Sequence, residues 1–104
     1  MVAVPEVVDI AAELTRVTDL WSLTTVAQLN DYAIELVKMA GEFMWHTHDS
    51  DKLFLVIAGE LQVQMRDRTV QVGPGQFVVV PRGVEHCPVA IGEVHALLIE
   101  PMHQ

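Results

Sequence analysis

Two histidines, His46 and His48, are separated by a single residue in this chain of 104 amino acids. On a β-strand that spacing directs both imidazoles to the same face of the sheet. Two imidazoles on one face supply half of the ligands of a first-row transition-metal site. The same spacing also occurs where two histidines only form hydrogen bonds, so the pair alone leaves both interpretations open.

The residues around this pair belong to a longer pattern, Gly41-(x4)-His46-x-His48-(x3)-Lys52-(x6)-Gly59. After a 15-residue gap a second pattern follows, Gly75-(x5)-Pro81-x-Gly83-(x2)-His86-(x3)-Ala90. In order, gap and turn glycines, the two patterns resemble the two motifs of the cupin superfamily. The resemblance covers roughly residues 39–100, and it is nearest to the small single-domain cupin-2 proteins often labelled mannose-6-phosphate isomerase-like.

The resemblance implies both a fold and a set of ligands. The implied fold is all-β, a single cupin β-barrel (a double-stranded β-helix, or jelly roll) with a short N-terminal helix. In the family, one divalent metal lies inside the barrel on four side chains, whose positions in this chain are His46, His48, Lys52 and His86. The implied cofactor is zinc, nickel, iron or copper. The implied activity is oxygenase-like, including dioxygenase-like, or isomerase-like, on a small organic substrate.

Lys52 stands where the family has a glutamate, and Ala90 where it has an asparagine. A charged ammonium has no lone pair for a metal, and it repels a divalent cation. Alternation back from Phe54 predicts that Lys52 points inward and Asp51 outward. Burial could leave Lys52 a neutral amine, or Asp49 or Asp51 could approach the metal instead. In the alternative reading Lys52 takes the place of the metal and anchors a carboxylate or similar anion in a non-catalytic binding barrel.

Four further side chains are candidates for a substrate pocket, namely Lys52, His95, Phe54 and Tyr32. His95 shares a strand face with Leu97 and Ile99, which predicts either an inward position near the site or a satisfied core histidine. Phe54 is suited to a pocket lined mostly by apolar groups, and Tyr32 could bring a hydroxyl to it. Cys87 follows His86, so it faces the other way and is predicted to be packed, not nucleophilic. The strand face that carries Arg66 is predicted to be solvated.

A short helix and a series of short strands are expected to position these residues. Apolar residues at helical spacing and Pro5 at the first position predict a helix over residues 5–18. Two strands are predicted between residues 21 and 39, joined by a turn at Asn30-Asp31. Further strands are predicted over residues 53–58, 61–65, 70–72, 77–80 and 94–99, separated by turn residues. We therefore expect an N-terminal helical segment over residues 1–20, packed on a barrel over residues 21–104.

The composition narrows the classes of partner. The net charge is −8 and only six residues are Lys or Arg, which excludes nucleic acid and anionic membranes and disfavours phosphosugars. The hydrophobic fraction of 51% is high for a short chain and predicts a homodimer that covers apolar surface. A single cysteine and an acidic N-terminal stretch without Lys or Arg predict a cytoplasmic protein that binds a small-molecule ligand.

Overall fold

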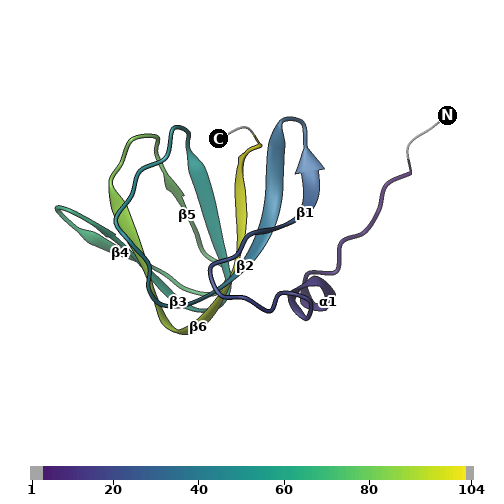
Figure 1. The fold of residues 1–104 in the computed structure, drawn as a ribbon, viewed down its shortest axis with the longest axis horizontal. Helices are drawn as coiled ribbons and strands as arrows, with labels where there is room; N and C mark the ends of the chain where they lie inside the picture. The colour runs from purple at the N-terminus through teal and green to yellow at the C-terminus, as the bar shows by residue number, and fades with distance from the viewer. Residues whose placement is uncertain (1–3, 103–104) are drawn as a thin grey trace.

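The computed structural model describes residues 4–102, and His103, for which no role is predicted, lies outside them. The elements in chain order are α1 (Ile10–Leu14), β1 (Thr24–Leu29), β2 (Tyr32–Glu42), β3 (Lys52–Met65), β4 (Thr69–Val72), β5 (Phe77–Val80) and β6 (His86–Pro101). The strands pair antiparallel in one sheet of order β1-β2-β6-β3-β4, with β5 on β3, and the sheet curves around an interior (Figure 1). The prediction of an all-β fold with a short helix is confirmed.

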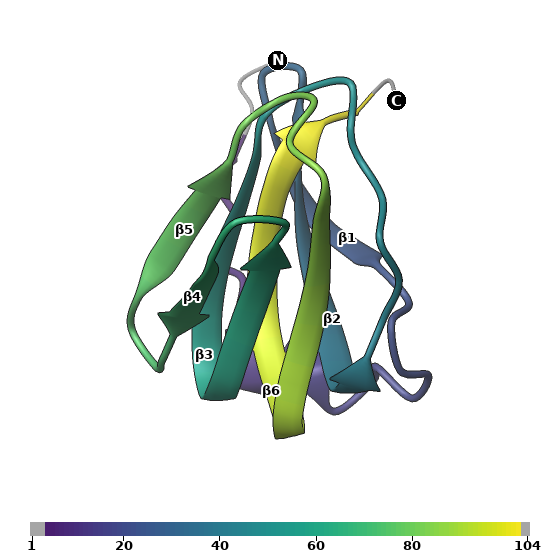
Figure 2. The same cartoon turned by 90° about the vertical axis from the view of Figure 1, so that its left-hand side faces the viewer.

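Strand β3 pairs with three other strands of the sheet. Its first half pairs with β5, its second half with β4, and β6 runs along its other side (Figure 2). The two strands predicted over residues 53–58 and 61–65 are one strand, interrupted by register shifts between Val56 and Glu60. Gly59 lies at this irregularity with a φ of 89°, and a Cβ there would be 2.5 Å from the carbonyl oxygen of Glu93. Only glycine tolerates that approach of β3 to β6.

Strand β6 begins at His86, well before the predicted residue 94. Pro88 lacks a backbone donor and Gly92 has a positive φ of 69°, so both weaken the strand signal in the sequence. The pairing with β3 nevertheless continues through this region, from Leu53 opposite Ile99 to Met65 opposite His86. The longer strand is what carries His86 to the same end of the barrel as residues 46 and 48.

The core fills the inner face of the curved sheet. Alternation along β3 turns Lys52, Phe54 and Val56 inward, and the corresponding inner residues of β6 are Val94, Ala96 and Leu98. Apart from Lys52, these residues form one apolar cluster with residues of β2 and of the second half of β3. Burying each large apolar side chain of this kind contributes about 1.5–3 kcal/mol to folding.

The helix is shorter than the predicted 5–18. Asp9 caps it, because its carboxylate accepts a hydrogen bond from the backbone N–H of Ala12 at 3.2 Å. Pro5 therefore lies outside the helix, and Val7 in the segment before the cap is 97% exposed. Helix α1 contacts β2 and buries Leu14, while the predicted boundary at residue 20 stays a prediction. No helix in residues 4–102 is long and apolar enough to cross a membrane.

Candidate metal centre

Two segments distant in sequence bring the three histidines together. His46 and His48 lie in the extended segment after β2, outside the named strands, and His86 is the first residue of β6. The backbones of His46 and His86 form a reciprocal antiparallel bridge, with each N–H donating to the other carbonyl at 3.0 Å. The His48 carbonyl in turn accepts a hydrogen bond from the N–H of Gly83 at 3.0 Å. These bonds fix the two segments side by side before any metal is considered.

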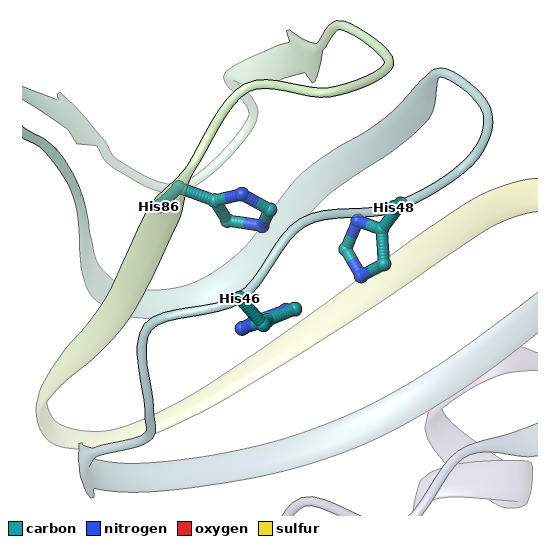
Figure 3. A group of neighbouring side chains, drawn as sticks. All are labelled: His46, His48 and His86. Carbon is teal, nitrogen blue, oxygen red and sulfur yellow. The ribbon is translucent and has the colours of Figure 1, made fainter.

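The three imidazoles converge on one space (Figure 3). One nitrogen from each ring can be chosen so that all three lie within 4.8 Å of one another, and the ring centroids are 4.5–5.0 Å apart. Bonds of about 2.0–2.1 Å would place tetrahedral ligand nitrogens roughly 3.3 Å apart. Small rotations of the side chains therefore suffice to bring the three nitrogens to metal-binding distance.

Backbone carbonyls orient two of the three rings. The Nδ1 atom of His46 is 2.8 Å from the carbonyl oxygen of Met44, and the Nδ1 atom of His86 is 2.8 Å from that of Val84. A carbonyl only accepts, so each Nδ1 carries the proton and each Nε2 keeps its lone pair. His86 Nε2 and His48 Nδ1 are buried and have no hydrogen-bond partner among the described residues. Buried nitrogens without partners are costly, and a metal ion would satisfy them.

The electrostatic surroundings keep the buried rings neutral. Burial and, to a smaller extent, the positive charge of Lys52 together lower the pKa of His48 to about 4. Burial also lowers the pKa of His86, although the hydrogen bond to Val84 acts in the opposite direction. The neutral imidazole is the form that binds metal, so both rings are prepared for it at neutral pH.

Lys52 points into the barrel as predicted, with 8% of its surface exposed. Asp51 is turned outward, where its carboxylate accepts a hydrogen bond from the N–H of Arg82 at 2.9 Å, and Asp49 is exposed. Within residues 4–102, no carboxylate joins the three imidazoles in the cluster. The donor set is therefore three neutral histidines, which fits zinc, copper, nickel or iron(II) with open positions for other ligands.

The positive charge of Lys52 is balanced by Glu100, a buried acid to which the sequence assigns no role. The Lys52 ammonium is 3.3 Å from the Glu100 carboxylate, and both side chains are about nine-tenths buried. Burial and, to a smaller extent, a hydrogen bond with Glu100 raise the pKa of Glu35, which lies next to this pair, to about 8. Burial also raises the pKa of Glu100, but the Glu35 hydrogen bond and the Lys52 charge outweigh this and leave it lowered. The Glu100 carboxylate therefore balances the positive charge of Lys52, and the raised pKa of Glu35 disfavours a second negative charge beside them.

The Glu35 carboxyl makes the stability of the barrel depend on pH. Its pKa is higher in the folded chain than the 4.5 of a free carboxyl, so its contribution is fully present below pH 4.5 and is lost as the pH rises through 8. We expect Glu35→Gln to match the wild type at pH 5 and to melt at least about 4 °C higher at pH 9, since roughly 1 kcal/mol corresponds to 4–8 °C in a domain of this size. Thermal melts of metal-free protein, with exposed Glu60→Gln as the control, measure this. Equal melting temperatures at pH 9 would contradict it.

A cavity of about 190 Å³ lies beside the histidines. Lys52 and Phe54 line it as predicted, and so do Trp21 and Phe43, whose stacked rings have centroids 4.8 Å apart. Neither aromatic residue of this second pair was assigned to the site from the sequence. Phe43 precedes the His46 segment, and Trp21 is held by a 3.1 Å hydrogen bond from its indole N–H to the Ala40 carbonyl.

Two predicted pocket residues lie elsewhere. His95 is on the outer face of β6, where its Nε2 is 2.6 Å from a carboxylate oxygen of Glu93, so the predicted inward position is wrong. Tyr32 is 46% exposed at the start of β2, beside the turn that joins β1 to β2. Cys87 is fully buried, as predicted, and burial raises the pKa of its thiol.

Arg66 contacts both histidine segments from the outside of the barrel. From the sequence, its strand face was predicted only to be exposed to solvent. Its guanidinium lies 3.8 Å from the ring centroid of Trp45, which precedes His46. It also donates two hydrogen bonds, at 2.8 and 3.2 Å, to the carboxylate of Glu85, which precedes His86. One side chain thus contacts the immediate neighbours of two candidate ligands.

We expect Arg66→Ala to weaken zinc binding about three- to tenfold, less than the roughly 10–100-fold typical of groups bonded directly to metal ligands. Arg68→Ala is the matched control, because the exposed Arg68 side chain forms an ion pair with the adjacent Asp67. Arg66→Lys should recover part of the affinity, since lysine keeps the charge over the Trp45 ring and loses the paired hydrogen bonds. Competition with a chromophoric chelator measures all four proteins. Equal loss in Arg66→Ala and Arg68→Ala would exclude a positioning role.

The comparisons with known proteins agree with this architecture. Residues 34–100 match the family model of the cupin domain, Cupin_2. A cupin-2 domain-containing protein from Shewanella frigidimarina NCIMB 400 is 40% identical, with a TM-score of 0.89 over 91% of this chain and 94% of that one. Protein NMB1881 from Neisseria meningitidis is 28% identical, with a TM-score of 0.83 over 92% of this chain and 99% of that one.

A relative in Bacillus subtilis is similar to part of this chain in sequence. The uncharacterized protein YdbB from Bacillus subtilis (strain 168) is 34% identical over 64 residues, which span 60% of this chain and 57% of that protein. The fold and the three-histidine cluster define a cupin barrel. The chain belongs to the cupin-2 family, which confirms the family prediction, while the mannose-6-phosphate isomerase-like subgroup is not singled out by these matches.

Proposed function

We propose that this chain binds one divalent transition-metal ion through His46, His48 and His86 and brings a small organic molecule beside it. The observation that carries the proposal is that two of the three grouped histidines, His48 and His86, each have a buried imidazole nitrogen with no hydrogen-bond partner within residues 4–102. The backbone carbonyls that hold the Nδ1 protons of His46 and His86 support it, because they direct the Nε2 lone pairs away from the backbone.

A metal ion on three histidines would polarise a carbonyl group or lower the pKa of a bound water, with open positions left for a substrate. The residues of this chain would supply the rest. Phe54 and the stacked pair of Trp21 and Phe43 give the cavity an apolar wall, and Lys52 offers hydrogen-bond donors beside it. The reaction class that this arrangement supports is oxygenase- or isomerase-like chemistry on a small substrate.

Elemental analysis of protein prepared without a polyhistidine tag or chelator tests the proposal directly. We expect close to one equivalent of a transition metal per chain, either as purified or after incubation with zinc, nickel, copper or iron(II). Less than about a tenth of an equivalent under all of these conditions would contradict the proposal. A site with a dissociation constant in the micromolar range or below retains most of its ion when the protein concentration is well above that constant.

The alternative function is an anion-binding barrel in which Lys52 replaces the metal. The ion pair between Lys52 and Glu100 at 3.3 Å argues against it, because the ammonium charge is already balanced inside the barrel. The same ion pair favours metal binding, since it offsets the repulsion that an unpaired lysine would exert on a cation.

We also propose that the protein is a cytoplasmic homodimer. The apolar outer face of β3, β5 and β6 supports the dimer, because Leu53 pairs with both Val79 and Ile99, and Leu55 with both Phe77 and Leu97, all side by side on that face. Phe77 is 64% exposed in the single chain. A second copy related by a two-fold axis covers such a face most simply. The single buried cysteine suits a reducing compartment.

A charge placed on this face should separate the dimer. We expect Val79→Lys to convert the protein to a monomer at micromolar concentration, because the ammonium would be buried without a partner in the interface. Val7→Lys is the control, since Val7 is exposed in the segment before α1. Sedimentation velocity of wild type and both variants measures the oligomeric state. A wild-type monomer, or a dimer that survives Val79→Lys, would overturn the assignment of this face.

A further inference from the structure

The cavity beside the three histidines is small and its wall is mainly apolar. Its volume of about 190 Å³ equals that of about six water molecules at roughly 30 Å³ each, below the roughly 300–1,000 Å³ of pockets for drug-sized ligands. The apolar part of the wall comes from Trp21, Val37, Met39, Phe43, Phe54 and Leu98. A single ring with a short substituent is about the largest molecule that fits such a space.

Hydrogen-bond donors enter this cavity from one side chain besides the histidines. Lys52 lines the wall, its ammonium lies 5.6 Å from the Phe54 ring centroid, and the Phe54 ring is 6.5 Å from that of His86. An ammonium has three donors, and that of Lys52 lies 3.3 Å from one carboxylate oxygen of Glu100. Lys52 can therefore donate to a ligand oxygen that lies between it and the imidazoles, over the Phe54 ring.

The charges around the cavity disfavour ligands that carry a full charge. Among residues 4–102, no acidic residue lines it, so an organic cation would find no counter-ion there. A carboxylate would meet an ammonium that Glu100 already pairs, and it would lose its hydration in an apolar space. An uncharged acceptor has neither cost and still receives a hydrogen bond from Lys52.

We propose that this pocket takes a small uncharged carbonyl compound, with one aromatic or branched apolar group on Trp21, Phe43 and Phe54 and its oxygen held by Lys52. The inference rests on the proposed function in that it treats the cavity beside the three histidines as the substrate pocket. It adds the chemical class of the ligand and makes Lys52 the residue that determines specificity.

Three probes of similar shape test the ligand class. Acetophenone carries an uncharged acceptor, benzoate an anion, and ethylbenzene no polar group. Titrations of metal-free, isotope-labelled protein by NMR follow the indole N–H of Trp21, which lines the cavity, while the indole of Trp45 beneath Arg66 serves as an internal control. We expect acetophenone to shift the Trp21 signal selectively and to bind about tenfold more tightly than ethylbenzene or benzoate, the difference that one hydrogen bond from a charged donor provides.

A pair of variants assigns the preference to Lys52. The double variant Lys52→Met/Glu100→Gln removes both members of the ion pair and should bind acetophenone and ethylbenzene equally. Lys38→Met, on the outer side of β2, should keep the tenfold preference. Tighter binding of benzoate than of acetophenone by the wild type would overturn the inference, as would no preference among the probes, and these results need no variant to fold.

Zinc binding to the same preparations separates this inference from the proposed function. Selective acetophenone binding by a protein that takes up no zinc would leave the ligand class standing and remove the metal centre. Zinc binding without a preference for acetophenone would support the metal centre and overturn the proposed ligand class.

Discussion

Replacing His86 with alanine should weaken zinc binding by more than about 100-fold, beyond the range for groups that only support a metal ligand. His86 is fully buried and is the first residue of β6. It is the one ligand in the cluster that comes from the second motif. The loss of one of three neutral donors leaves two imidazoles from one short segment, which is too few to compete with water for a divalent ion. Competition with a chromophoric chelator measures the affinity, and the absorption spectrum of cobalt(II)-substituted protein reports the ligand field.

Two companion variants separate coordination from folding. His46→Ala removes a ligand that is only half-buried, so it should lose zinc to a similar extent with less effect on the melting temperature. His95→Ala is the matched control, because His95 lies on the outer face of the barrel against Glu93. Wild-type zinc affinity in both His46→Ala and His86→Ala would refute the three-histidine site.

Replacing Lys52 with methionine should destabilise the barrel by about 3–5 kcal/mol, the usual cost of removing one partner of a buried ion pair. The variant leaves the Glu100 carboxylate in an apolar interior without the ammonium 3.3 Å away. In the double variant Lys52→Met/Glu100→Gln no uncompensated charge remains, so most of the lost stability should return. Urea unfolding of the wild type, Lys52→Met, Glu100→Gln and the double variant at pH 7 gives the coupling energy between the two residues.

The coupling energy decides between two views of Lys52. Additive effects of Lys52→Met and Glu100→Gln would mean that the two charges are solvated independently and that the pair does not neutralise the site. A strongly favourable coupling would show that the ion pair is maintained as a unit beside the histidines. The measurement is made on metal-free protein, so that changes in zinc binding do not contribute to the free energy of unfolding.

The three-histidine cluster was predicted from the resemblance of two short motifs to those of the cupins, because the spacing of His46 and His48 alone left both interpretations open. Each motif is local, since its turn glycines and histidines lie within one short segment. The backbone bridge between His46 and His86 then needs only that the two segments be neighbours. The inward direction of Lys52 was predictable for the same reason, since alternation from Phe54 determines it.

The partners of Lys52 were not predictable, because they depend on register across three strands. Glu100 lies opposite Ala33 of β2, and Glu35 lies two residues further along that strand, so the two carboxyl groups meet diagonally on the inner face. Glu35 interrupts an apolar run in β2 and Glu100 ends one in β6, which is the only sequence signal that marks them. A charged residue at an inward position of an apolar strand predicts a buried partner without identifying it.

His95 was placed on the wrong face for a related reason. Its neighbours on the same face, Leu97 and Ile99, are as apolar as the inward residues Ala96 and Leu98. Alternation therefore groups the residues of β6 into two faces and does not say which of them is inside. The outer face is apolar because, in our proposal, a second copy covers it.

The bridge between His46 and His86 also affects how the chain folds and unfolds. It joins two segments that lie on either side of β3, β4 and β5 in the sequence, so forming it closes a long loop. Contacts that depend on such long-range pairing carry a large loop-closure cost and tend to be absent from the folding transition state. An ion held across the bridge would stabilise the native state without stabilising that transition state. The loaded barrel should therefore fold no faster than the empty one and unfold more slowly, so that metal occupancy sets its lifetime.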